Sequence, residues 1–417
     1  MTKYKLGEIC DLNKESLSSK DSYLDIEYLD TSSITENTID NIQYIQYCDA
    51  PSRAKRKVRH NTIVYSTVRP RLKHYGILTN PAENLIVSTG FVTIDVKEEF
   101  ADTIDPYYLF LYLTKPLITD NLANIADTAV SAYPSINPSD LANIIIDCPK
   151  LNEQRKIASL IQNVDNKIAL NRALNHNLEA MAKQLYDYWF VQFDFPDKEG
   201  KPYKSSGGKM VWNVKLKRYI PEGWECKNLL DIAIFTNGLA CQKYRPTTEA
   251  KLPVIKIREM HDGFTTDTEW VKADIPDSVK IFNGDVLFSW SASLEVMLWC
   301  FGEGGLNQHI FKVTGKDGFP RSYYYYQLKD YVNVFKAIAE ARKTTMGHIT
   351  QDHLQQSTIA VPPTTELPIL LEKKIAPLFE QIITLQEENA HLVKLRDELL
   401  PLLMNGQVSV NYDLSAD

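Results

Sequence analysis

Two long segments of this sequence place an apolar residue at every seventh position, with one polar exception in the first, and each segment follows a similar short motif. The motif occupies residues 135–149 before the first segment and residues 348–362 before the second, so both features recur roughly 213 residues apart. A period of this length greatly exceeds the roughly 20–50 residues of a solenoid repeat. The sequence therefore predicts a duplicated module in which a globular domain is followed by a long helix.

The seven-residue spacing predicts that the two helices pack on each other as an antiparallel coiled coil. Each helix should be about 60 Å long, which exceeds the radius of a small globule. Packing of each helix on its own globule is the alternative. Asn171 is a polar residue within the first heptad pattern, and a buried Asn there usually sets the register at some cost in stability. The positions expected at the helix-pair interface are Ile157, Val164, Asn171, Leu178, Leu185, Leu371, Leu378, Leu385, Leu392 and Leu399.

The remaining sequence alternates short β-rich runs with turns, which predicts two mixed α/β (α+β) globules. We expect strands at 60–66 and 85–94 and a helix at 106–115 with Asp105 as its N-cap. Residues 283–289 of the second half match the strand at 60–66. The predicted pseudo-two-fold organisation has a first domain at 1–150, a spacer helix at 151–191, a linker at 192–223, a second domain at 224–363 and a second spacer helix at 364–406.

Composition excludes several classes of protein. The 417 residues are 44% apolar and 24% charged, which is typical of globular domains. The six cysteines form no Cys-x-x-Cys pair, so neither a zinc site nor a disulfide framework is expected. No apolar run approaches the roughly 18 residues that cross a bilayer, and the N-terminus lacks the apolar core of a signal peptide. The expectation is a cytoplasmic protein with no membrane partner.

The net charge of −7 does not suggest a nucleic-acid ligand, but residues 51–75 are rich in cations and contain no acidic residue. Arginine at this density can bind phosphates and can read guanine edges. A solvated basic surface without a ligand is the alternative. The candidate DNA-binding residues in this run are Arg53, Lys55, Arg56, Lys57, Arg59, Arg69, Arg71 and Lys73.

The second globule has weaker counterparts to this basic run. Trp290 and the serines after it stand where the first copy has residues 67–70, and such differences suit two sites with different targets. The candidates in this half are Lys243, Tyr244, Arg245, Lys256, Arg258, Trp290, Ser291, Ser293, Arg342 and Lys343.

No segment of the sequence carries a recognisable catalytic motif. Residues 301–305 approach an adenosylmethionine-binding loop, but Glu303 stands where the first glycine is required. Residues 361–364 lack the amide and the aromatic ring with which adenine methylases hold a flipped base. A Gly-x-x-x-x-Gly-Lys phosphate loop is also missing. The sequence therefore predicts no catalytic residues and no metal site.

Taken together, these features resemble the specificity subunit of type I restriction-modification enzymes over essentially the whole chain. The resemblance implies a non-catalytic subunit in which each globule is a target recognition domain for one half of a bipartite, gapped site in double-stranded DNA. It also implies that the helices set the gap and dock two adenine methylase subunits. The segments that carry the resemblance are residues 65–70, 151–157, 193–208, 220–224 and 285–291.

The resemblance further implies that no cofactor binds this chain. S-adenosylmethionine, ATP and Mg²⁺ would be used by the methylase subunits and by restriction/translocase subunits that join them. Two other readings remain open: a self-contained DNA methyltransferase or nuclease, and a coiled-coil scaffold with two protein-binding globules. Methylation by the isolated chain would favour the enzyme, and DNA affinity that survives charge reversal of Arg69 and Arg71 would favour the scaffold.

Overall fold

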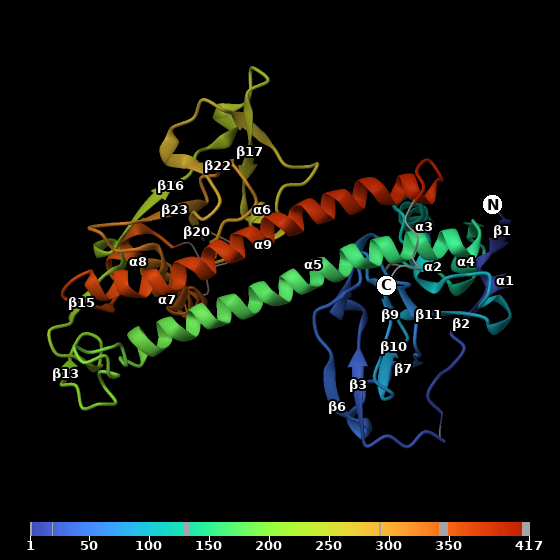
Figure 1. The fold of residues 1–417 in the computed structure, drawn as a ribbon, viewed down its shortest axis with the longest axis horizontal. Helices are drawn as coiled ribbons and strands as arrows, with labels where there is room; N and C mark the ends of the chain where they lie inside the picture. The colour runs from blue at the N-terminus through green and yellow to red at the C-terminus, as the bar shows by residue number, and fades with distance from the viewer. Residues whose placement is uncertain (1, 19, 129–133, 292, 342–348, 411–417) are drawn as a thin grey trace. The chain divides into compact units, whose positions relative to one another are not determined.

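The chain folds into two units that share two long helices, α5 (Leu151–Tyr186) and α9 (Glu366–Met404) (Figure 1). Unit 1 contains residues 1–167 and 394–417, and unit 2 contains residues 168–393. The predicted mixed α/β class is confirmed. The computed structural model describes residues 2–18, 20–128, 134–291, 293–341 and 349–410.

Unit 1 is built on two four-stranded sheets and two short pairs of strands. The first sheet has the order β6 (Gln43–Gln46), β3 (Asp25–Leu29), β10 (Leu85–Ser88), β7 (Ala54–Lys57). The second has the order β2 (Cys10–Leu12), β11 (Phe91–Val96), β8 (Thr62–Ser66), β9 (Tyr75–Leu78). The pairs are β1 (Thr2–Lys5) with β12 (Ile145–Cys148) and β4 (Ile34–Thr35) with β5 (Thr38–Ile39). The helices are α1 (Leu6–Ile9), α2 (Pro106–Leu113), α3 (Pro116–Thr128) and α4 (Pro138–Ala142).

Unit 2 repeats this strand order. Its first sheet runs β18 (Trp270–Lys272), β17 (Lys251–Ile255), β22 (Gly304–Leu306), β19 (Lys280–Ile281). Its second runs β16 (Ala233–Asn237), β23 (Ile310–Gly315), β20 (Val286–Ser289), β21 (Glu295–Leu298), and β15 (Glu225–Lys227) pairs with β24 (Ile359–Val361). The helices are α6 (Ile257–Asp262), α7 (Arg321–Ala341) and α8 (Gln351–Gln355). In each unit one pair is parallel, β3 with β10 and β17 with β22. The predicted match of residues 60–66 with 283–289 is confirmed, because β8 and β20 hold the same place in their sheets.

Helix α2 begins as its sequence predicts. The Asp105 carboxylate accepts a hydrogen bond from the backbone N–H of Tyr108 at 2.9 Å, and Pro106 is the first helical residue. The first N–H groups of a helix have no partner within the helix. Asp105 accepts a hydrogen bond from one of them, and Pro106 has no N–H that would need a partner. The helix is buried from Tyr107 to Leu113 and packs against β8 and β9, so it closes the core of unit 1.

The single strand expected at 85–94 is wrong. The chain turns at Thr89 and Gly90, so β10 and β11 lie in different sheets. Gly90 is required because a Cβ there would lie 2.8 Å from Thr31 Cγ2. The apolar run hides this turn, since both strands are buried on both faces.

Residues 192–223 do not form the open linker that their Gly, Pro and Ser content suggested. Strands β13 (Met210–Asn213) and β14 (Arg218–Pro221) make a hairpin in this segment. Phe193, Phe195 and Ile220 are buried in the core of unit 2. The glycines serve tight turns with positive φ, 79° at Gly200 and 91° at Gly207. The segment is therefore part of unit 2.

Within each unit, contacts between α5 and α9 show that the helices are antiparallel. Asn171 contacts Asn389 and Asn175 contacts Gln386 in unit 2, and Asp165 pairs with Arg396 in unit 1. The residue number therefore falls along α9 as it rises along α5. Helix α5 also packs on the globule of unit 1, because its residue Ile157 is part of the core of that unit.

The predicted interface residues differ in burial. Leu174 and Met181, which flank the heptad, are 40% and 56% exposed, whereas Asn175 and Ala182 are buried in their place. The interface is consequently apolar toward its ends and polar around Asn171. Of the predicted positions, Ile157, Asn171, Leu371 and Leu385 are buried, whereas Val164, Leu178, Leu185, Leu378, Leu392 and Leu399 are half-buried. In the described part of the chain, no helix has the length and apolar character needed to cross a membrane.

Candidate nucleic-acid interface

The basic run of unit 1 is divided between the two ends of β8. Arg53 accepts a hydrogen bond at its backbone oxygen from Thr89 N–H, and Thr67 N–H donates to Gly90 O at 2.9 Å. Arg53 therefore lies at the end where β8 leads into residues 69–73. Four exposed cations gather at this end: Arg53, Arg69, Arg71 and Lys73.

The backbone after β8 is held in an unusual shape. Arg69 and Lys73 have φ of 48° and 55°, in the left-handed region that non-glycine residues rarely adopt. Arg69 N–H donates to Pro134 O at 3.0 Å, and Thr67 O accepts from Ile136 N–H at 2.9 Å. These bonds fix the loop, and the side chains of Arg69 and Arg71 are exposed. Strain retained at an exposed basic loop is typical of a functional site.

Arg59 lies at the opposite end of β8 and is held by a buried carboxylate. Its Nε donates to Asp95 Oδ1 at 3.1 Å, and the Asp95 side chain is only 8% exposed. Thr62 donates its hydroxyl to the same oxygen at 2.6 Å. A buried carboxylate needs such partners, so Arg59 contributes to the stability of unit 1 whatever else it binds.

Strand β7 carries the remaining basic residues of the run. Lys55 is exposed, Arg56 donates to Ser16 Oγ at 2.9 Å, and Lys57 forms an ion pair with Asp21. The hydrogen bond from Lys57 lowers the pKa of the Asp21 carboxyl below its usual value. Lys57 is thus partly neutralised.

Acidic residues from distant parts of the chain meet the basic loop as well. Arg71 pairs with Asp127 at 2.9 Å, and Lys73 pairs with Glu36 at 2.5 Å. Both pairs are about half exposed, and such surface pairs contribute little free energy. They can therefore open in favour of a phosphate. The sequence predicted that residues 51–75 form one basic face. The structure instead places the exposed cations of the loop at one end of β8 and Arg59 at the opposite end of that strand.

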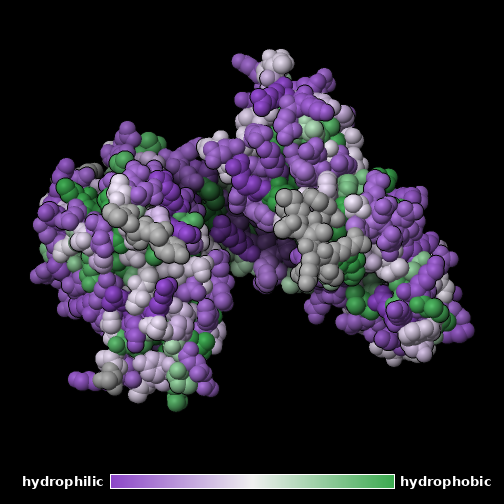
Figure 2. All heavy atoms as spheres, turned by 180° about the vertical axis from the view of Figure 1, so that it is seen from behind, coloured by the Kyte–Doolittle hydropathy of each residue, from purple (hydrophilic) through white to green (hydrophobic). Residues whose placement is uncertain are grey.

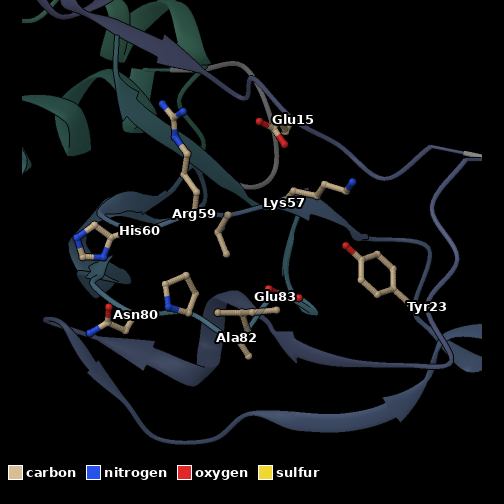
Figure 3. Close-up of a pocket in the computed structure, with 11 residues that line it drawn as sticks. Glu15, Tyr23, Lys57, Arg59, His60, Asn80, Ala82 and Glu83 are labelled. Atoms are coloured by element: carbon tan, nitrogen blue, oxygen red, sulfur yellow. The ribbon is translucent and has the colours of Figure 1, made fainter. Parts of the chain in front are cut away.

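A cavity of about 460 Å³ lies beside β7 and the segment 80–85. Lys57 and Arg59 both contribute to its lining but point away from each other, and His60 lies next to Asn80 (Figure 3). Glu15 and Glu83 add negative charge. This mixed charge does not favour an anionic ligand, so we assign the cavity no role.

In unit 2 the end of β20 carries a polar and aromatic cluster. Trp290 Nε1 donates to Asn237 Oδ1 at 3.3 Å, and its ring lies 5.6 Å from the ring of His309. Asn237 ends β16, and His309 closes the turn between β22 and β23. Sequence reasoning identified Trp290 but missed Asn237 and the turn 307–309. The signal that could have found the turn is its alignment with Thr89–Gly90 in the duplicated topology.

Cations surround this cluster. The turn Cys241–Tyr244 follows β16 and presents exposed Lys243, with exposed Arg245 next to it. Lys256 and Arg258 follow β17, whose last residue Ile255 accepts a hydrogen bond from Asn307 N–H. The lobe built around β17 shows mainly hydrophilic side chains on the face in Figure 2. Six of the residues predicted in unit 2 thus come after the ends of three strands: Lys243, Tyr244 and Arg245 after β16, Lys256 and Arg258 after β17, and Trp290 after β20.

Two of these cations also have carboxylate partners. Lys256 pairs with Glu269, and Arg258 pairs with buried Glu259 at 2.8 Å. The hydrogen bond to Glu259 raises the pKa of Arg258. The Lys272 ammonium lies over the ring of Tyr244, 5.5 Å from the centroid of that ring. Sequence reasoning did not identify Lys272.

The remaining predicted residues of unit 2 differ in position. Ser291 is buried and its backbone oxygen accepts from Ser289 Oγ at 3.1 Å, so it shapes the turn after β20. Ser293 is exposed nearby. Arg342 and Lys343 lie outside the described residues.

The two long helices are anchored to their globules by different residues. The Gln154 side chain is fully buried; its Oε1 accepts from Asp105 N–H at 2.9 Å, and its Nε2 donates to Thr103 O and Pro149 O. On α9, the Glu372 carboxylate accepts from Ser322 N–H at 2.7 Å, at the start of α7. Hence the Gln154 amide anchors α5 to the globule of unit 1, and the Glu372 carboxylate anchors α9 to the globule of unit 2.

Comparison with known proteins gives consistent matches. The family model described as "Type I restriction modification DNA specificity domain" matches residues 1–180 and 221–395. The type I restriction enzyme HindI specificity subunit of Haemophilus influenzae is 25% identical, over 97% of this chain and 99% of that protein. The MjaIX specificity subunit of Methanocaldococcus jannaschii is 26% identical, over 90% and 86%. The crystal structure of a type I restriction-modification S subunit from M. genitalium has a TM-score of 0.57 at 13% identity, covering 96% and 95%, and shows a similar fold.

Proposed function

The chain belongs to the type I restriction-modification DNA specificity family, and from this premise we propose that each of its units reads one half of a bipartite, gapped DNA site. In this role the chain is a DNA-recognition subunit and not a catalytic one. It would act in the cytoplasm, where its duplex substrate lies.

The observation that carries the proposal is the repeated strand order of the two units. The ends of β8 and β20 are topologically equivalent, yet they carry different side chains, an arginine-rich loop in unit 1 and Trp290 in unit 2. Phosphate contacts position a protein on DNA, whereas base contacts give it specificity. The same scaffold with different strand-end residues supports two related sites with different target sequences.

The helix pair supports the second part of the proposal. Both helices contribute residues to both units and run antiparallel within each. We propose that they act as the spacer that sets the gap and as the docking surface for two adenine methylase subunits. S-adenosylmethionine would be used by those partners, and ATP with Mg²⁺ by restriction/translocase subunits.

A scaffold without a DNA role is the second candidate. Its support is the pairing of several basic residues with acids, such as Arg71 with Asp127. The basic loop after β8 favours DNA, because its ion pairs are about half exposed and can open, and exposed Lys243 and Arg245 add cations in unit 2.

A domain exchange tests the proposal. Residues 224–363 would be replaced by the corresponding residues of the Haemophilus influenzae relative, and the chimera would be co-expressed with the cognate methylase. The proposal predicts that methylated sites keep one half of the motif and the gap but change the other half. A chimera that assembles with the methylase yet keeps the whole parental motif would favour the scaffold.

A further inference from the structure

We infer that the turn Asn307–His309 of unit 2 reads base edges of one half-site, and that Gln308 and His309 are specificity-determining side chains. The inference deepens the proposed function and rests on it. The turn connects β22 to β23, and its backbone is bonded to two neighbouring segments.

The backbone of the turn is held firmly. Asn307 N–H donates to Ile255 O at 3.1 Å, and Gln308 N–H donates to Leu239 O at 2.8 Å. A side chain at Gly238 would collide with the backbone oxygen of Asn307, so β16 can approach the turn only through a glycine. A reader of base edges needs side chains on such a rigid support, because less entropy is then lost on binding.

The side chains of the turn have the chemistry of base recognition. Asn307 is buried, whereas Gln308 and His309 are half-buried. Gln308 Nε2 lies 3.4 Å from His309 Nε2, so the amide and the imidazole stand together. An amide can form two hydrogen bonds with the major-groove edge of adenine. The imidazole adds a donor or an acceptor.

The environment of His309 Nδ1 does not favour the stability of the fold. Its Nδ1 is buried and has no hydrogen-bond partner among the described residues. Such an atom lowers the stability of a fold. The ring is nevertheless kept against Trp290, which orients it.

The two segments that hold the turn also carry the cations. Leu239 leads into Lys243 and Arg245, and Ile255 leads into Lys256 and Arg258. The segments bonded to the turn therefore lead into four cations, of which Lys243 and Arg245 are exposed, whereas Lys256 and Arg258 are paired with Glu269 and Glu259. Phosphate contacts from such cations would fix the position of unit 2 on the duplex, while contacts from the turn to base edges would give specificity.

Unit 1 lacks the same reader. Its corresponding turn between β10 and β11 is Thr89–Gly90, which is one residue shorter and has no amide or imidazole. Substitutions in the turn 307–309 should therefore affect only one half-site.

The test is a methylation map of Gln308→Ala and His309→Ala chains, each co-expressed with the cognate methylase. We expect discrimination at one or two positions of a single half-site to fall at least about fivefold. The other half-site and the gap should stay unchanged. Gln356→Ala is the matched control, because Gln356 is an exposed amide of unit 2 that lies outside both the turn and the long helices.

Each result decides the inference. Variants that methylate the parental motif with parental selectivity overturn it. If an alanine variant melts at a lower temperature and loses all methylation, Gln308→Glu and His309→Asn take its place, since they keep the size and polarity of the turn; unchanged selectivity in both overturns the inference. A parental complex that shows no bipartite motif contradicts the proposed function itself.

Discussion

Asn171 on α5 donates a hydrogen bond from its Nδ2 to Oδ1 of Asn389 on α9, at 3.1 Å, and both side chains are buried. The same Nδ2 donates to Glu388 Oε2 at 2.8 Å. One turn away, Asn175 donates to Gln386 at 3.1 Å. The interface between the helices therefore contains a polar layer, where coiled coils normally place apolar residues.

The first prediction concerns this layer. Asn171→Leu and Asn389→Leu, each alone, should lower the melting temperature, because each leaves a buried amide without its partner, at a cost of about 1–3 kcal/mol. The double substitution should melt above both single variants, since no buried amide then faces an apolar side chain, and the Glu388 carboxylate that also loses Asn171 is only half-buried. Calorimetry of the four proteins measures this, with exposed Asn177→Leu as the control. A double variant that melts below the single ones would show that the pair is not coupled.

Leu385 and Leu392 provide the second prediction. Leu385 is 6% exposed, so replacing both residues with Glu places charge in the interface and should separate the helices. Specific DNA binding should fail while both globules keep their secondary structure by circular dichroism. The control is Glu at Leu395 and Leu402, which are 46% and 37% exposed on the same helix. A folded Leu385 and Leu392 variant with parental specificity would refute the spacer role.

The third prediction concerns the basic loop after β8. Charge reversal of Arg69 and Arg71 should abolish binding to one half-site and leave the fold intact, because both side chains are exposed. Loss of two phosphate contacts should also reduce the slope of log affinity against log salt by about 2. Fluorescence anisotropy with duplexes of the mapped site measures both effects. Lys3 and Lys5, also exposed in unit 1, receive the same charge change as a control; equal affinities in the two variants would favour the scaffold.

Gln154 supplies the fourth prediction. Gln154→Ala removes three hydrogen bonds to partly buried backbone groups and should lower the stability of unit 1 by at least about 2 kcal/mol. Gln154→Glu should also destabilise it, because a carboxylate cannot donate to Thr103 O and Pro149 O. Thermal melting measures the loss, and Gln162→Ala on the same helix is the control, because Gln162 makes none of these three bonds. Equal melting temperatures for the Gln154 and Gln162 variants would contradict the anchoring role.

The features that the sequence predicted are those with local causes. The Asp105 cap of α2 and the strand β8 depend on neighbouring residues, and both were found. The side of α5 that faces α9 depends on its partner, so polar Asn175 is buried whereas its apolar neighbour Leu174 is 40% exposed. The acids that meet the basic run, such as Asp95 and Asp127, lie far from it in the sequence.

Other features could not be read locally. The turn 307–309 can be identified as the counterpart of Thr89–Gly90 only when the strand orders of the two units are compared. The segment 192–223 has the composition of a linker, but its aromatic residues reach a core that other parts of unit 2 build.

The most direct test of two-domain DNA reading is a map of methylated adenines in a methylation-free host that expresses this chain with its neighbouring adenine methylase. The account predicts one bipartite motif with a fixed gap, methylated only when both proteins are present. A stable complex that methylates no defined motif, or a motif without a gap, would contradict it.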